Sequence, residues 1–206
     1  KKKNEILFIS DYTNKKPDVI KSKKIKNFEF YNKPQEKILK ILEQYCKEKN
    51  INYSILTRPP YTNNTKDEVN YFLNLKKINK YKFDIIKGKK NFGNYKICDQ
   101  FNLAITLNSA LGYENVARGN KTFFLPVNEK YFRIKKDFLL WSIKKLKKNV
   151  IWEDKMMKKK IFLKLDNIIK MNKKDYQKII KDMSSGGLIS YDKNNNTIKN
   201  IIKNIL

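Results

Sequence analysis

The segment from Tyr95 to Val127 constrains the fold most, because it contains two short apolar strands joined by a helix. Its residues predict a short helix over Tyr95–Phe101, a strand over Asn102–Leu107, a helix after the turn Asn108-Ser109, and a strand over Lys121–Val127. Asn or Ser before an apolar periodic run indicates a helix N-terminus, and Gly119 after Arg118 indicates a helix end. A polar turn between a buried parallel strand and a helix N-terminus favours anionic ligands, because backbone N–H groups and the helix dipole point there.

The rest of the chain continues this alternation of strands and helices. Further strands are expected at Ile6–Ser10, Asn52–Thr57 and Phe83–Ile86, and helices at Gln35–Lys49, which Asn50 ends, and Asp67–Leu75. After Val127 the pattern predicts helices at Asp137–Leu146, Phe162–Lys170, Lys173–Met183 and Thr197–Ile205, with a short strand at Val150–Trp152. We therefore expect an α/β fold with a doubly wound, Rossmann-like parallel sheet over residues 1–150, and C-terminal helices over residues 151–206 that brace the same domain.

Composition excludes several kinds of chemistry. The chain has 206 residues and no histidine, which excludes His-centred triads and most zinc sites. Cys46 and Cys98 both fall in predicted helices beside apolar residues, which favours reduced thiols and a cytoplasmic protein. No apolar run approaches the ~20 residues of a membrane span. The sequence contains no Walker loop, Cys-x-x-Cys or G-x-G-x-x-G motif.

The net charge of +27 has two interpretations. It could serve an anionic partner, such as a nucleotide, nucleic acid or an acidic membrane surface. It could also reflect biased composition, because Lys, Asn, Ile and Tyr are all abundant. The lysines are scattered and arginine is restricted to Arg58, Arg118 and Arg133, so we favour biased composition and expect no specific nucleic-acid partner. Peripheral contact with the anionic inner face of the membrane stays open.

The segment Asn102–Phe124, NLAITLNSALGYENVARGNKTFF, resembles the donor-site segment of GT-B glycosyltransferases that build bacterial surface carbohydrate. In that family a strand of the type D-hydrophobic-V-I-T precedes S-T-L-G-Y-E-A-hydrophobic-A-R-G-K. The matching residues are Asn108, Ser109, Leu111, Gly112, Tyr113, Glu114, Ala117, Arg118 and Gly119. Ala110 stands where Thr is usual, which removes one hydroxyl from the expected phosphate site. The tail Tyr191-Asp192-Lys193-Asn194-Asn195 is similar to the family's closing Y-D-x-x-N, although Tyr191, Asp192 and Asn195 could simply cap the last helix.

The resemblance implies that this chain is the C-terminal, donor-binding half of a GT-B fold. The implied substrates are a nucleotide-sugar donor and a glycan acceptor, with no cofactor and no metal. The chain contains no complete catalytic set, so the resemblance also implies a missing N-terminal α/β domain that carries the base and the acceptor site. Two alternatives remain: a non-catalytic basic module that binds nucleic acid or anionic membrane, and a sugar-nucleotide epimerase of GT-B architecture.

A set of binding residues follows from the resemblance together with the positions of the predicted strand ends. Glu114 is expected to accept hydrogen bonds from ribose hydroxyls, and Ser109 and Thr106 to contact phosphate. Gly112 allows close backbone approach or simply helix–sheet packing. Arg118 could pair with phosphate or with the helix C-terminus. The full expected set is Asp11, Arg58, Thr106, Asn108, Ser109, Ala110, Leu111, Gly112, Glu114 and Arg118, with Asp11 near the sugar and Arg58 near the phosphates.

Overall fold

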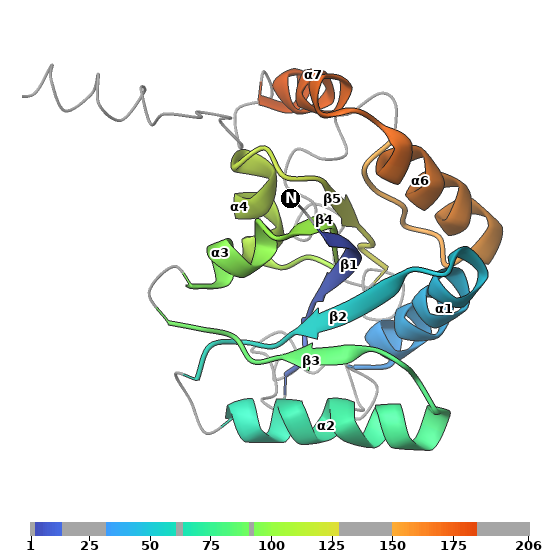
Figure 1. The fold of residues 1–206 in the computed structure, drawn as a ribbon, viewed down its shortest axis with the longest axis vertical. Helices are drawn as coiled ribbons and strands as arrows, with labels where there is room; N and C mark the ends of the chain where they lie inside the picture. Colours follow the sequence, from blue (N-terminus) through green and yellow to red (C-terminus); the bar gives the residue numbers. More distant parts are fainter. Residues whose placement is uncertain (1–2, 14–31, 61–63, 91–92, 128–149, 185–206) are drawn as a thin grey trace, which may run out of the picture.

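The computed structural model describes residues 3–13, 32–60, 64–90, 93–127 and 150–184 (Figure 1). The strands are β1 (Lys3–Ile9), β2 (Asn52–Leu56), β3 (Asp84–Ile86), β4 (Phe101–Thr106) and β5 (Thr122–Phe124). The helices are α1 (Lys33–Lys49), α2 (Asn64–Asn79), α3 (Gly93–Cys98), α4 (Ala110–Ala117), α6 (Lys158–Lys170) and α7 (Lys173–Ser184). Strands and helices alternate from β1 to β5, which confirms the predicted α/β class.

The strands form one parallel sheet in the order β3-β2-β1-β4-β5. The register aligns the last residues of all strands in one row, Ile86, Leu56, Ile9, Thr106 and Phe124. The chain builds outward from β1 in one direction and then restarts on the other side at β4. In such sheets ligands bind outside the carboxyl ends of the strands, where the order reverses. The topology therefore predicts a ligand site at the carboxyl edge of the sheet, beside β1 and β4.

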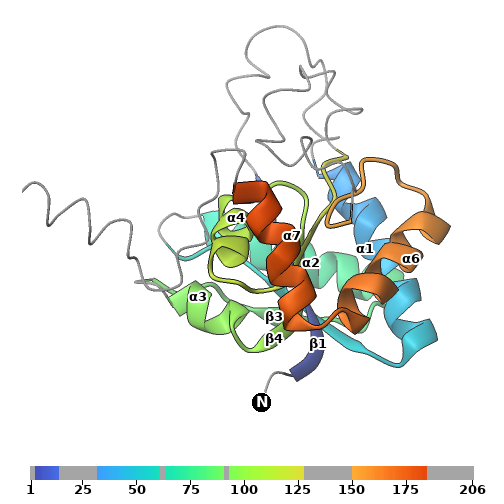
Figure 2. The same ribbon diagram turned by 90° about the horizontal axis from the view of Figure 1, so that it is seen from above.

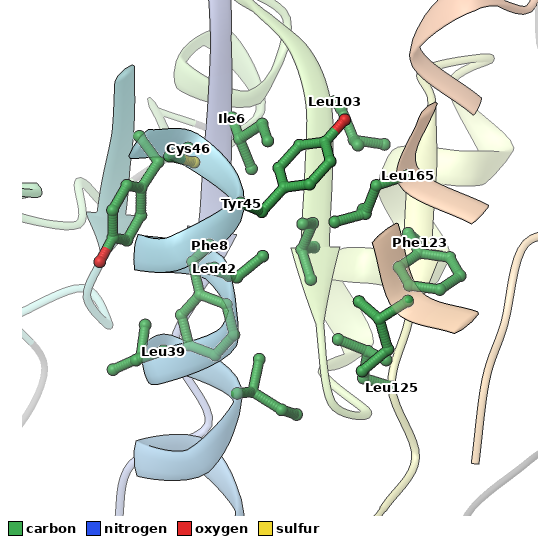
Figure 3. Packing of buried hydrophobic residues seen from close by; sticks show 14 of the residues in the cluster. Ile6, Phe8, Leu39, Leu42, Tyr45, Cys46, Leu103, Phe123, Leu125 and Leu165 are labelled. Carbon is green, nitrogen blue, oxygen red and sulfur yellow. The ribbon is translucent and has the colours of Figure 1, made fainter. Parts of the chain in front are cut away.

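Helices cover both faces of this sheet (Figures 1 and 2). Ile6 and Phe8 of β1 face a core that contains residues of α1, α2 and α6, whereas Leu7 and Ile9 face α3. This alternation explains why the strands are apolar along their whole length. Figure 3 shows side chains of α1 and α6 packed over the strands, with Leu39, Leu42, Tyr45 and Leu165 near Phe8, Leu103, Phe123 and Leu125.

The helix ends follow the sequence signals. Asn50 ends α1 in the left-handed conformation, with φ of 51°. Gly119 follows α4 with φ of 78°; its N–H donates to the Val116 carbonyl, and that of Asn120 donates to the Asn115 carbonyl. These two bonds form a Schellman motif, so the predicted glycine stop of the central helix is confirmed.

Several boundaries differ from the sequence prediction. Helix α2 begins before Asp67 and runs past Leu75 to Asn79, because polar residues extend it until Lys80 turns the chain with φ of 54°. Helix α3 begins before Tyr95, and Phe101 belongs to β4. Strand β5 stops at Phe124, since the Val127 N–H turns back to the Leu125 carbonyl at 2.7 Å. In the Val150–Trp152 segment, Trp152 forms a single parallel bridge to Phe124 rather than a strand. Helices α6 and α7 are present as predicted, α6 from Lys158 onward, and the expected helices at 137–146 and 197–205 lie outside the described residues.

The C-terminal helices pack against the same sheet. Tyr45 donates a hydrogen bond to Asp166 at 2.8 Å, and Lys49 pairs with the same carboxylate at 2.9 Å. Lys164 pairs at 2.6 Å with the buried Glu153. On the other face, Tyr176 and Ile180 of α7 share a core cluster with α4. These contacts join α6 and α7 to the sheet and α4, while the division at residue 150 and the bracing by residues 151–206 stay predictions.

Both cysteines are free and buried, as predicted. Burial, followed by a nearby carboxylate (Glu43 for Cys46, Asp99 for Cys98), raises the pKa of each thiol to about 12. The thiols therefore stay protonated and unreactive. Among the helices described, none has the length and apolar character needed to cross a membrane.

Candidate functional site

The candidate site begins at the turn between β4 and α4. Ser109 stands in extended backbone at the N-terminus of α4, as predicted, but its side chain makes no capping hydrogen bond. Instead the Ser109 N–H donates to the Thr106 hydroxyl at 3.1 Å, and the Gly112 N–H donates to the Ser109 carbonyl at 2.9 Å. The Ala110 and Leu111 N–H groups lie in the first turn of α4, where backbone N–H groups have no intrahelical acceptor. The turn thus presents a hydroxyl and backbone donors at the positive end of α4.

Two of the predicted residues, Thr106 and Gly112, lie where this turn and α4 pack on the sheet. Thr106 is fully buried, and its hydroxyl oxygen holds the Ser109 N–H. Gly112 lies directly against the sheet: a Cβ atom there would be 2.5 Å from Thr106 Cγ2 and 3.2 Å from Phe124 Cε1. Of the two interpretations of Gly112, these contacts match helix–sheet packing.

Asn108 lies at the rim of the turn. Its side-chain oxygen accepts a hydrogen bond from the Tyr113 hydroxyl at 2.8 Å, and the Tyr113 ring packs on Phe124 with centroids 4.8 Å apart. This bond orients the Asn108 amide, whose NH2 group has no hydrogen-bond partner in the part of the chain that the structure describes. Asn108 is therefore a preoriented donor beside the helix N-terminus.

The exposed side of α4 carries Ala110, Glu114 and Arg118 at intervals of four residues. The Tyr95 hydroxyl of α3 donates to the Glu114 carboxylate at 3.0 Å. Arg118 pairs with Asp99 and lies over the Tyr95 ring, 5.2 Å from its centroid. At ~1.5 Å rise per residue, Arg118 lies about 12 Å along the helix from Ala110. The structure thus keeps Glu114 one turn from the helix start and places Arg118 at the opposite end, where it complements the helix C-terminus.

Asp11 and Arg58 follow β1 and β2, each two residues beyond the common end row. The Asp11 N–H donates to the Gln35 side-chain oxygen at 2.9 Å, and the Arg58 N–H donates to the Glu68 carboxylate at 3.1 Å. Desolvation raises the pKa of Asp11, although the Arg58 charge opposes the shift. Asp11, Arg58 and Asn108 all stand two residues past the same row, so they share the carboxyl edge of the sheet.

Gln35 and Glu68 were missed from the sequence. Glu68 is buried, and desolvation raises its pKa; its contacts with Ser10 and Arg58 oppose the shift, and Asp11 adds to it. One signal was available: Glu68 shares a helical spacing with the apolar residues Tyr71, Phe72 and Leu75, so it falls on the inward face of α2. For Gln35, directly after Pro34, no comparable signal exists.

The remaining expectations have different outcomes. Leu111 packs partly buried against the core of the α3 face, so it contributes backbone rather than side chain to the turn. Tyr191, Asp192 and Asn195 lie outside the described residues. No three Cys, Asp or Glu side chains in the described ranges gather as a metal site would require. A hollow of about 190 Å³ lies at the opposite edge, lined among others by Glu43, Asn52 and Lys82; there Tyr53 and the Lys82 N–H both donate to Glu43.

The chain is similar to one described protein family and to a solved structure. Residues 1–206 match a protein family described as "putative O-antigen biosynthesis protein". No curated protein matches the chain in sequence. Among solved structures, the wall teichoic acid polymerase TagF is similar, with a TM-score of 0.49 and 18% sequence identity over 99% of this chain and 44% of the polymerase chain. The present chain therefore spans less than half the length of that polymerase.

Proposed function

Because the chain belongs to this family of O-antigen biosynthesis proteins, we propose that it is the donor-binding half of a GT-B glycosyltransferase, which moves a sugar from a nucleotide-sugar to a cell-surface glycan. The family match confirms the assignment to surface polysaccharide synthesis that the Asn102–Phe124 motif predicted. The donor itself is our inference. It rests on one observation above all, the uncapped N-terminus of α4 at the point where the strand order reverses.

Phosphate is the group that this turn suits best. The first N–H groups of a helix and its dipole, equivalent to roughly +0.5 charge, stabilise an anion without a metal. Ser109 adds a hydroxyl and Asn108 an oriented amide beside them. When the glycosyl bond breaks, the leaving diphosphate gains charge, and fixed donors at that position lower the barrier to transfer. No cofactor is required by this scheme.

Glu114 is proposed to bind the ribose. It lies one helical turn beyond Ala110 on the exposed side of α4, so a nucleotide with its phosphates at the helix start extends toward it. The hydrogen bond from Tyr95 holds the carboxylate in place, while one carboxylate can accept further bonds from ribose hydroxyls. Arg118 has no proposed role in the donor site, because its charge is paired with Asp99.

The remaining partners follow from the same proposal. A glycan acceptor and an N-terminal α/β domain with the catalytic base would complete the enzyme. Buried, protonated cysteines favour a cytoplasmic location. The net charge of +27 is compatible with peripheral contact with the anionic inner face of the membrane, and it is also the observation behind the rival function, a non-catalytic basic module.

Titration calorimetry with pyrimidine nucleotides and nucleotide-sugars tests the proposal through Glu114→Gln. This change keeps the shape but removes a charged acceptor, and charge-assisted hydrogen bonds contribute about 1.5–3 kcal/mol. Nucleotide affinity should fall roughly 10- to 100-fold, at about 1.4 kcal/mol per tenfold, with little change in melting temperature. Glu48→Gln is the matched control, since that carboxylate pairs with Lys158 between α1 and α6, away from α4, and should leave affinity unchanged.

Two results would count against the proposal. If single-stranded nucleic acid binds with strong salt dependence while no nucleotide binds, the chain is a basic module instead. If Glu114→Gln lowers the melting temperature and leaves nucleotide affinity intact, Glu114 is a structural residue.

A further inference from the structure

Two buried side chains accept hydrogen bonds from the backbone just beyond the ends of β1 and β2. Gln35, in the first turn of α1, is 2% exposed, and Glu68, near the start of α2, is 1% exposed. Gln35 accepts a hydrogen bond from the Asp11 N–H, and Glu68 accepts one from the Arg58 N–H. They therefore fix the backbone of Asp11 and Arg58, two residues beyond the ends of β1 and β2. Nothing in the proposed phosphate and ribose contacts uses these four residues.

Each of these buried side chains keeps one polar atom without a hydrogen-bond partner among the described residues: the amide nitrogen Nε2 of Gln35 and the carboxylate oxygen Oε1 of Glu68. The Tyr71 hydroxyl lies near Gln35 and the Ser10 hydroxyl near Glu68, but neither contact reaches hydrogen-bond geometry. Leaving such an atom unsatisfied costs about 1–3 kcal/mol, so native proteins keep few of them. Both atoms are buried, so they mark a polar cluster kept behind Asp11 and Arg58 for function, and not atoms that a ligand itself reaches.

The charges around this cluster are unsuited to phosphate. Asp11 and Glu68 are two carboxyl groups that repel each other, and Arg58 is the positive side chain acting on both. A second phosphate would meet at least as much negative as positive charge here. Tyr12 and Tyr71 stack beside the cluster, with ring centroids 4.8 Å apart, and offer the apolar surface against which a carbohydrate ring packs. A neutral group rich in hydroxyls fits both features.

The cluster lies only one to two strands away from the turn that is proposed to bind phosphate. Strand β1 pairs with β2 on one side and β4 on the other, and neighbouring strands are about 4.8 Å apart. Asp11 is therefore one strand from Asn108, and Arg58 is two strands from it, all in the same row beyond the sheet. A diphosphate at α4 would direct its attached group over β1 and β2.

Building on the proposed function, we propose that Asp11, Gln35, Arg58 and Glu68 form the subsite for the transferred group, and that this group is an uncharged, hydroxyl-bearing sugar rather than an acidic one. Asp11 and Arg58 are the partly or fully exposed members that touch the sugar. Gln35 and Glu68 are positioning residues behind them.

The test compares three ligands of one nucleoside in calorimetry: the diphosphate alone, its neutral hexose conjugate and its uronic acid conjugate, for each nucleoside in turn. Wild type should bind the neutral conjugate more tightly than the diphosphate and the acidic conjugate no more tightly. Asp11→Asn should reduce that preference about tenfold and leave diphosphate affinity within about twofold. Asp84→Asn, which removes a carboxylate whose side chain is 83% exposed at the start of β3, is the matched control and should preserve the preference.

The outcomes separate this subsite from the proposed function. Equal affinity for diphosphate and neutral conjugate in wild type, tighter binding of the acidic conjugate, or equal weakening of both by Asp11→Asn would overturn the subsite and leave the donor site standing. Binding of no nucleotide would overturn both. A melting curve of Asp11→Asn that matches wild type shows that the comparison reports on binding and not on folding.

Discussion

At the scale of single residues, burial raises the pKa of some carboxyl groups, whereas hydrogen bonds and nearby cations lower the pKa of others. Burial raises the pKa of Glu68, and the nearby Asp11 charge adds to that shift. Glu153 is also desolvated, but its hydrogen bonds to Lys164 and the Lys155 N–H outweigh burial and lower its pKa. Glu153 thus stabilises the fold when ionised, whereas Glu68 resembles a functional carboxyl whose charge is a cost to the fold.

Glu68→Gln tests that cost. In the unfolded chain a Glu has the ordinary pKa of 4.5, and in the fold the pKa of Glu68 is higher. Between these two values the native state binds more protons, so stability falls as pH rises and the loss is complete above the folded pKa. Glu68→Gln should therefore gain stability over wild type at about pH 8 and much less at about pH 4, measured by urea unfolding.

The control for this experiment is Asp84→Asn, because the Asp84 side chain is 83% exposed. Its stability should stay near wild type at both pH values. An equal stability difference between wild type and Glu68→Gln at the two pH values would contradict the account of Glu68.

Sequence reasoning reached some of these residues and not others, for a physical reason. Glu114, Ser109 and Asn108 lie within one strand–turn–helix unit, so local spacing is enough to bring them together. Gln35 and Glu68 act on Asp11 and Arg58, 24 and 10 positions away in sequence. Each contact joins a strand end to the start of the next helix, and the pairing of β1 with β2 brings the two contacts together; that pairing is not visible in a single sequence.

At the scale of elements, α4 is held by its close approach to β4 and β5. Gly112 allows that approach, with Thr106 and Phe124 filling the space where a side chain would stand. The alternation of strands and helices was predictable because apolar runs and turn signals are local. Helix and strand ends were less so: α2 continues through polar residues, partly because Lys76 donates to the Phe83 carbonyl at 2.6 Å and ties its last turn to the chain before β3.

Gly112→Ala measures this packing. Helix propensity alone favours alanine by about 1 kcal/mol, whereas a new methyl group in a filled space typically costs about 1–3 kcal/mol. Since the new carbon would meet Thr106 at 2.5 Å, the steric cost should win and unfolding in urea should shift to lower concentration. Ala110→Ser, on the exposed side of the same helix, should change stability by less than about 0.5 kcal/mol. A gain in stability for Gly112→Ala would mean that α4 lies farther from the sheet.

At the scale of the whole molecule, the strand order gathers the chemistry at one edge. The ends of β1, β2 and β4 bring Asp11, Arg58 and Asn108 into one row, with Ser109 and the start of α4 beside them. The sequence pattern predicts a parallel sheet, and a Rossmann-like resemblance predicts its type, but the order β3-β2-β1-β4-β5 requires the structure. Exposed lysines of the described residues lie on α6 and α7, for example Lys159 and Lys174, and the interpretation of the +27 charge as biased composition stays a prediction.

A nucleotide-sugar should bind at this carboxyl edge, and amide chemical-shift mapping measures where it binds residue by residue. Adding the tightest-binding nucleotide-sugar to the full chain should perturb the amides of Ser109, Ala110 and Leu111 most, with smaller shifts at Asp11 and Arg58. Amides at the amino edge, such as those of Asn52 and Lys82, should stay unchanged and serve as the internal control. Shifts confined to the lysine-rich outer sides of α6 and α7, or to the amino edge, would contradict the donor site.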